Sequence, residues 1–144
     1  MSREIIIALI LQIAVEIGVP PYFALSIALT ENPTLNPNAV SPLNRDGSRD
    51  RGLMQLNNRY FVDIDWRCPE TNIRAGIGLI KRLMNYPGIT TFFDVAVSYN
   101  CGHAWLVYGY RPPESSIDYA NKVMQKWQEL EYWSYINPVI QGRR

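Results

Sequence analysis

The sequence predicts a mainly α-helical domain with one small β-hairpin beside the end of a helix. Apolar residues recur at helical spacing along most of the chain. The main exception is residues 32–50, which are rich in Pro, Asn, Ser and Asp and precede a short run that suits a strand. With 144 residues, 47% of them hydrophobic, the chain is long enough for a single domain, residues 1–144, with its own core.

Two helices are predicted before the polar stretch. The first covers residues 3–17 and ends at Gly18, which suits the left-handed cap of a helix. The second begins at Pro20-Pro21, because proline is tolerated in the first turn. We expect it to end near Glu31, because the next residue precedes a proline and is biased away from the helical region.

The apolar run in the first helix has some features of a signal peptide. Polar residues recur on one side of it, however, and no small-residue cleavage site follows. It is also too short to span a membrane. We therefore interpret residues 3–17 as part of the domain and expect no export signal. A protein that acts outside the cell membrane would then need a virion, a membrane lesion or a dedicated secretion machine to reach its site of action.

After the polar stretch, Asp46-Gly47 predicts a tight turn and residues 53–57 predict a short strand, so a hairpin is expected around that turn. A helix is expected from Pro69 to about residue 86, and residues 105–113 are expected to form a loop. The predictions for the rest of the chain are a short helix capped by Thr90 or Thr91 and ended by Gly102, a long helix from a cap at Ser115 or Ser116 to about Trp133, and a frayed tail ending in Arg143 and Arg144.

The composition excludes several classes of function. A net charge of +1 offers no electrostatic basis for binding nucleic acid. A single His103 and two cysteines predict neither a metal site nor a bound cofactor. Cys68 and Cys101 suit either one disulfide bridge or two small buried residues, and we take the second as the default. We expect a monomer.

Glu31 is the first candidate for a catalytic residue. It shares one helix face with Ala24, Ile27 and Ala28, so an acid stands where a core residue is expected. Burial and the negative end of the helix dipole both disfavour the charged carboxylate. A carboxyl that stays protonated near neutral pH can act as a general acid. The alternative interpretation is a solvated glutamate on the last turn of the helix.

Asp50 is the second carboxylate, across the expected turn from Glu31. A paired acid and carboxylate is the minimum equipment for cleaving a glycosidic bond. Gln55 and Asn57 would add amide groups on one face of a strand. Aromatic side chains that suit stacking on sugar rings follow in Tyr99, Tyr108, Tyr110 and Tyr119. Alternatively, Tyr99 and Tyr119 are core residues, and Asp46 and Asp50 are ordinary turn residues.

Two segments around the expected turn form a recognisable pair: residues 31–42, beginning Glu31-Asn32-Pro33, and Gly52-Leu53-Met54-Gln55. They resemble the first and second motifs of the soluble lytic transglycosylase (SLT) domain, which has a lysozyme-like α+β fold. Ser98-Tyr99-Asn100 matches its Ala-Tyr-Asn motif with one substitution, and Tyr119 stands where the family has a late tyrosine. The resemblance implies a helical bundle around a catalytic helix, a hairpin flanking the cleft, and glycan contacts by Met54, Gln55, Asn57, Tyr99, Asn100, Tyr108 and Tyr119.

A second resemblance covers residues 44–57, which are similar to the central hairpin of animal c-type lysozymes. It places Asp50 on that family's second catalytic carboxylate. Some transglycosylases of secretion and conjugation machines carry a similar Gly-Ser-x-Asp segment, so Asp50 alone does not distinguish the two reactions. Asn32 departs from the SLT pattern, which has a serine there. Because Asn32 can still form hydrogen bonds, we expect a tuned site.

These resemblances imply an enzyme that cleaves peptidoglycan between N-acetylmuramic acid and N-acetylglucosamine at the bacterial cell wall. In a lytic transglycosylase Glu31 would act as acid and then as base, giving 1,6-anhydro ends. In a hydrolytic lysozyme Asp50 would also act on the sugar. A third hypothesis is a catalytically silent glycan-binding module of a phage tail or secretion machine.

Overall fold

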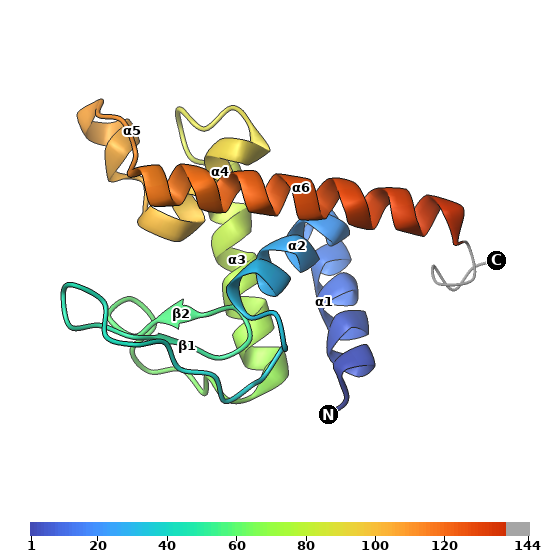
Figure 1. The fold of residues 1–144 in the computed structure, drawn as a ribbon. Coiled ribbons are helices and arrows are strands. Elements are labelled where there is room, and N and C mark those ends of the chain that lie inside the picture. The colour runs from blue at the N-terminus through green and yellow to red at the C-terminus, as the bar shows by residue number, and fades with distance from the viewer. Residues whose placement is uncertain (138–144) are drawn as a thin grey trace.

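The computed structural model describes residues 1–137, so the expectation for the tail that ends in Arg143 and Arg144 lies outside the described residues. Helices and one two-stranded antiparallel sheet form this part of the chain (Figure 1). The elements in order are α1 (Arg3–Ile17), α2 (Pro21–Glu31), β1 (Asp50–Arg51), β2 (Leu56–Asn57), α3 (Pro69–Met84), α4 (Phe92–Cys101), α5 (Ala104–Tyr108) and α6 (Glu114–Ile136). The mainly α-helical fold class with a small hairpin is therefore confirmed.

Helix α2 is the most enclosed element of the fold. It packs against α1 on one side and the long α6 on another, and α6 also packs against α4 (Figure 1). Six consecutive residues of α2, from Phe23 to Ala28, are buried. Phe23 makes edge contacts with Phe92 of α4 and Trp127 of α6 at centroid distances of 5.0 and 4.9 Å. This aromatic contact fixes three helices relative to one another, and each of them carries a residue of the site described below.

The predicted bounds of the first helices are confirmed. Helix α1 ends at Gly18, whose φ of 91° is the left-handed conformation that glycine adopts without strain. Helix α2 ends at Glu31, one residue before Asn32-Pro33. Thr91 caps α4 by accepting a hydrogen bond from the Asp94 amide, as one of the two predicted caps.

Two predictions about the C-terminal half were wrong. The residue that precedes α6 is Pro113, and Ser116 lies inside the helix with its hydroxyl bonded to Asn100. Part of the expected loop over residues 105–113 is the short helix α5. A third prediction, that Cys68 and Cys101 are two small buried residues, was also wrong. Both cysteines are unbridged, Cys68 is half-buried and Cys101 is exposed.

The hairpin differs from the predicted one in its register. A turn does form at Asp46-Gly47, and Val40 bridges Arg51 across it. The strand expected over residues 53–57 is only Leu56–Asn57, and it pairs with β1 around a second turn at residues 52–55. Gly52 and Gln55 have positive φ values of 79° and 53°, which an extended strand does not allow.

Asn72 of α3 holds this second turn against the helices. Its buried side chain accepts a hydrogen bond from the Met54 amide at 2.8 Å and donates to the carbonyl oxygens of Arg51 and Trp66. A Cβ on Gly52 would lie 2.2 Å from the Asn72 amide nitrogen, so only glycine fits there. One side chain thus satisfies three main-chain groups of a segment that has little regular pairing.

We predict that Asn72→Ala lowers the free energy of unfolding by about 3 kcal/mol, because it leaves buried main-chain groups without partners at roughly 1 to 3 kcal/mol each. Urea unfolding monitored by circular dichroism measures this. The matched control is Asn121→Ala on the exposed face of α6, which should change stability by less than about 0.5 kcal/mol. Equal effects of the two substitutions would contradict the role of Asn72.

Candidate active site

Glu31 is the last residue of α2 and the centre of the site. Its side chain keeps part of its surface open to solvent, although protein atoms surround the carboxyl closely. Burial raises the pKa of Glu31 from its ordinary value of 4.5 to about 7. The nearby Tyr119 hydroxyl opposes this rise in pKa because it is placed to stabilise the charged carboxylate, and the charge of Asp50 adds to the rise. The carboxyl therefore exchanges its proton near neutral pH.

Two tyrosines from different helices line the carboxyl. Burial raises the pKa of Tyr99 (α4) and of Tyr119 (α6) well above 10, and in both the charge of Glu31 is the next cause. The Tyr99 hydroxyl donates to the Met54 carbonyl oxygen at 2.7 Å. The buried Tyr119 hydroxyl faces Glu31 but makes no hydrogen bond of standard geometry with any described residue. Both phenols remain neutral donors at physiological pH, and Tyr119 keeps its capacity to donate.

Asn32 connects the end of α2 to the hairpin. The buried Asn32 side chain donates to the carbonyl oxygens of Asn36 at 2.9 Å and Gly52 at 3.3 Å, and accepts from the Asn36 amide. These bonds are with the main chain of the loop and the hairpin. Asn32, where the resemblance implies a serine, therefore joins the loop that follows α2 to the hairpin.

Asp50 lies in β1 within a network of side-chain amides. Asn57 donates to one of its carboxylate oxygens at 3.1 Å, and Asn44 donates to the other at 3.3 Å. The same two amides donate to the Ser48 hydroxyl, which in turn donates to Asp46. Asp50 influences the pKa values of both Glu31 and Tyr99 through its charge. The two predicted carboxylates therefore belong to one electrostatic environment.

The predicted residues of the second motif have mainly internal partners. The Met54 side chain is fully buried, and a Cβ on Gly76 would lie 2.6 Å from it. The Asn57 amide is bonded within the Asp50 network, and its oxygen accepts from the Arg59 amide. Gln55 is half-buried, and its side-chain nitrogen donates to the carbonyl oxygen of Gly52 at 3.0 Å. Its side-chain oxygen accepts no hydrogen bond from residues 1–137.

The remaining predicted residues lie on α4, α5 and α6. Asn100 is exposed, and its side-chain oxygen accepts from Ser116 at 2.7 Å. Tyr108 is 76% exposed at the end of α5. The structure thus brings Glu31, Asp50, Tyr99 and Tyr119 into one group, in which charges affect the pKa values of Glu31 and of both tyrosines. Tyr108 lies on a separate exposed segment.

The sequence did not identify three polar side chains that position these groups. Asn44 donates to Asp50 and to the Ser48 hydroxyl, and Asn72 accepts from the Met54 main chain. Asn44 and Ser48 stand at turn positions, where such residues are expected for local reasons. The sequence offers one signal for the role of Asn72, which is its position as a polar residue directly beside the apolar face of α3.

The arrangement has the properties of an acid–base site. A carboxyl with a pKa of about 7 can both give and take a proton, and neutral phenol donors stand beside it. Among the described residues, no group of three or more His, Cys, Asp or Glu side chains is arranged to hold a metal ion. The mainly α-helical fold with its small hairpin is of the lysozyme-like class, and the carboxyl at the end of α2 supplies an acid–base group.

The family comparison agrees with this class. The model of the Transglycosylase SLT domain family matches residues 8–108, which is more than two thirds of the chain. The chain belongs to this family, whose domains act on the peptidoglycan of the cell wall. The comparisons with curated proteins and with solved structures returned no significant match. No helix within residues 1–137 is long and apolar enough to cross a membrane.

The raised pKa of Glu31 predicts a pH-dependent cost in stability. Between pH 4.5 and about 7 the unfolded chain has lost this proton and the folded chain retains it, so the contribution of Glu31 to stability falls as pH rises. Glu31→Gln removes this loss. We predict that the variant gains stability relative to the wild type by up to about 3 kcal/mol between pH 4.5 and 8.

Urea unfolding of both proteins at several pH values measures the difference, in which the other titrating groups largely cancel. The exposed Glu129→Gln provides the control and should give a difference nearly independent of pH. A flat difference for Glu31→Gln would contradict the burial of its carboxyl.

Proposed function

We propose that this protein is a peptidoglycan lytic transglycosylase that cleaves the β-1,4 bond between N-acetylmuramic acid and N-acetylglucosamine. The observation that carries the proposal is the placement of the Glu31 carboxyl at the enclosed end of α2, beside Tyr119 and Asp50, where burial raises its pKa to about 7. A reaction without water needs one group to donate a proton in the first step and accept one in the second. Near neutral pH, Glu31 meets both requirements.

In the first step the Glu31 carboxyl gives its proton to the glycosidic oxygen. The bond from this oxygen to the anomeric carbon of the muramic acid breaks, and the ring becomes an oxocarbenium-like cation. In the second step the C6 hydroxyl of the same sugar attacks the anomeric carbon and returns a proton to the Glu31 carboxylate. The products are a free 4-hydroxyl and a 1,6-anhydro end, and the enzyme regains its starting state.

The neighbouring residues support these two steps. Tyr119 can donate to the Glu31 carboxylate after the proton has left, because its hydroxyl has no other acceptor among the described residues. The hydrogen bond from Tyr99 to the Met54 carbonyl holds the second turn beside α4. Gln55 and Asn100 would bind the glycan, whereas the buried Met54 and the fully bonded Asn57 would shape the wall.

Hydrolysis is a second candidate because of the position of Asp50. Its charge contributes to the pKa of Glu31, so Asp50 belongs to the same electrostatic environment and could stabilise a positive sugar ring. In that mechanism Asp50 stabilises or captures the cation, and a water molecule completes the reaction. The chemistry at Glu31 is the same in its first step, so the products distinguish the two reactions.

We predict that Glu31→Gln lowers turnover of purified sacculi by at least about a hundredfold, because general-acid catalysis is lost. Mass spectrometry of wild-type digests should give muropeptides with anhydro ends. Reducing ends that contain one added water would contradict the transglycosylase and favour the hydrolase. Unchanged turnover by Glu31→Gln, with Glu129→Gln as the matched control, would remove Glu31 from both mechanisms.

Asp50→Asn separates the roles of the two carboxylates. For a transglycosylase we predict activity within about tenfold of the wild type and the same anhydro products, because only electrostatic assistance is lost. A hydrolase that needs Asp50 should lose activity by several orders of magnitude. Asp63→Asn, at an exposed position, controls for the change of charge.

A further inference from the structure

Residues 101–115, from the last residue of α4 to the second residue of α6, form a segment at the surface of the domain. None of its residues is buried, although it includes α5. Its two ends are held together by the hydrogen bond from Ser116 to Asn100 at 2.7 Å. We call this segment the strap. It begins two residues after Tyr99 and ends four residues before Tyr119, so it starts and finishes at the two tyrosines that face Glu31.

Few contacts hold the strap to the body of the protein. The Trp105 indole donates to the Ser98 hydroxyl at 3.0 Å, and the His103 ring lies 4.3 Å from the Tyr86 ring. The ion pair of Arg111 with Glu114 lies within the strap. These contacts place the strap without enclosing it.

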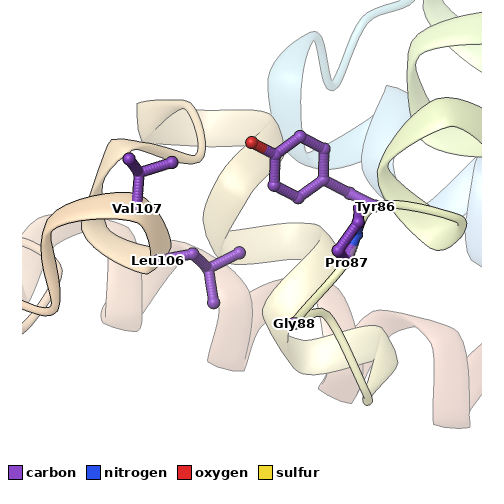
Figure 2. A pocket seen from close by; sticks show the side chains of 5 residues that line it. All are labelled: Tyr86, Pro87, Gly88, Leu106 and Val107. Carbon is purple, nitrogen blue, oxygen red and sulfur yellow. The ribbon is translucent and has the colours of Figure 1, made fainter.

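A cavity of about 330 Å³ separates α5 from the turn after α3. Leu106 and Val107 line it on one side, and Tyr86, Pro87 and Gly88 line it on the other (Figure 2). It contains neither Glu31 nor Asp50, so it is not the acid–base site. Its position means that α5 is not packed tightly against the adjoining turn. Trp105 is the residue of α5 that packs against the core, so movement of α5 would affect the core at this side chain.

Glycines flank α5 at both ends. Gly102 has a φ of 84° and Gly109 a φ of 71°, which side-chain-bearing residues rarely adopt. A Cβ on either glycine would meet nothing within 4 Å. Gly102 is the C-cap of α4 and Gly109 is the C-cap of α5, so backbone conformation rather than lack of space accounts for glycine at these positions. Glycine also leaves the backbone on each side of α5 freer to turn than another residue would.

The strap carries exposed apolar side chains that have no role in the core. The exposed fractions are 58% for Val107, 76% for Tyr108 and 51% for Tyr110. A tyrosine ring offers an apolar face together with a polar hydroxyl. Sugar rings likewise combine an apolar face with hydroxyl groups, so these tyrosines match a glycan better than they match a purely apolar partner.

We propose that the strap closes over a glycan strand bound at Glu31, turning about Gly102 and Gly109, and places Tyr108 and Tyr110 on the sugar rings. Closure covers the apolar surface that the free protein exposes and excludes water from the neighbourhood of the muramic acid. This inference rests on the proposed function, because it takes the same glycan as the substrate.

Hydrogen exchange measured by mass spectrometry tests the closure. The protein is Glu31→Gln, and the probe is glycan strands stripped of their stem peptides by an amidase. We expect binding to slow exchange in residues 31–57 and, by about tenfold or more, in residues 102–113. Protection of residues 31–57 alone would overturn the strap and leave the proposed function intact. Protection of neither region would contradict glycan binding at the site, and with it both proposals.

Substitution of the exposed tyrosine provides a second readout in the active enzyme. Tyr108→Ala should raise KM for glycan strands about tenfold and change kcat less, because the contact is made with bound substrate remote from the reacting bond. Tyr132→Ala on α6, which is 66% exposed, is the matched control and should change neither constant. The proposal fails if Tyr108→Ala and Tyr132→Ala have the same KM as the wild type.

Discussion

The burial of one carboxyl at the end of α2 is the constraint on which this structure depends. A glutamate keeps its proton near neutral pH only where water is largely excluded from it. Here the exclusion comes from a helix that is enclosed on most sides and from two tyrosines on neighbouring helices. The contacts of Phe23 with Phe92 and Trp127 therefore serve two purposes, since they stabilise the core and orient α4 and α6 toward Glu31.

The hairpin side of the site is organised differently, by side-chain amides. Its two strands have only two residues each, so main-chain pairing alone leaves many polar groups unsatisfied. Asn72 satisfies three of these groups from α3, and Asn32 connects Gly52 to the end of α2. These hydrogen bonds hold the hairpin against α3 and against the end of α2, where Glu31 lies. Loss of such an amide should displace the site before it unfolds the domain.

The limits of the sequence prediction follow from this contrast. Local signals set the bounds of the helices: Gly18 ends α1, and the proline after Asn32 ends α2. The turn at residues 52–55 was predicted as part of a strand because Leu53, Gln55 and Asn57 alternate plausibly with their neighbours. What decides the conformation is the distant Asn72, together with the left-handed Gly52 and Gln55. Contacts across twenty residues between an amide and a main chain leave no periodic pattern in one sequence.

The position of Asp50 bears on how the proposed reaction avoids or admits water. Each of its oxygens accepts one amide hydrogen bond, which fixes the carboxylate and leaves it further lone pairs. Its charge raises the pKa of Glu31, so it helps to keep the proton on the acid before cleavage. After cleavage the same charge favours a positive sugar ring. Asp50 can therefore assist a transglycosylase electrostatically without ever bonding to the substrate. In that case the choice of nucleophile, water or the C6 hydroxyl, depends on how completely the bound glycan is covered. A water molecule that reaches the anomeric carbon competes directly with the hydroxyl of the same sugar.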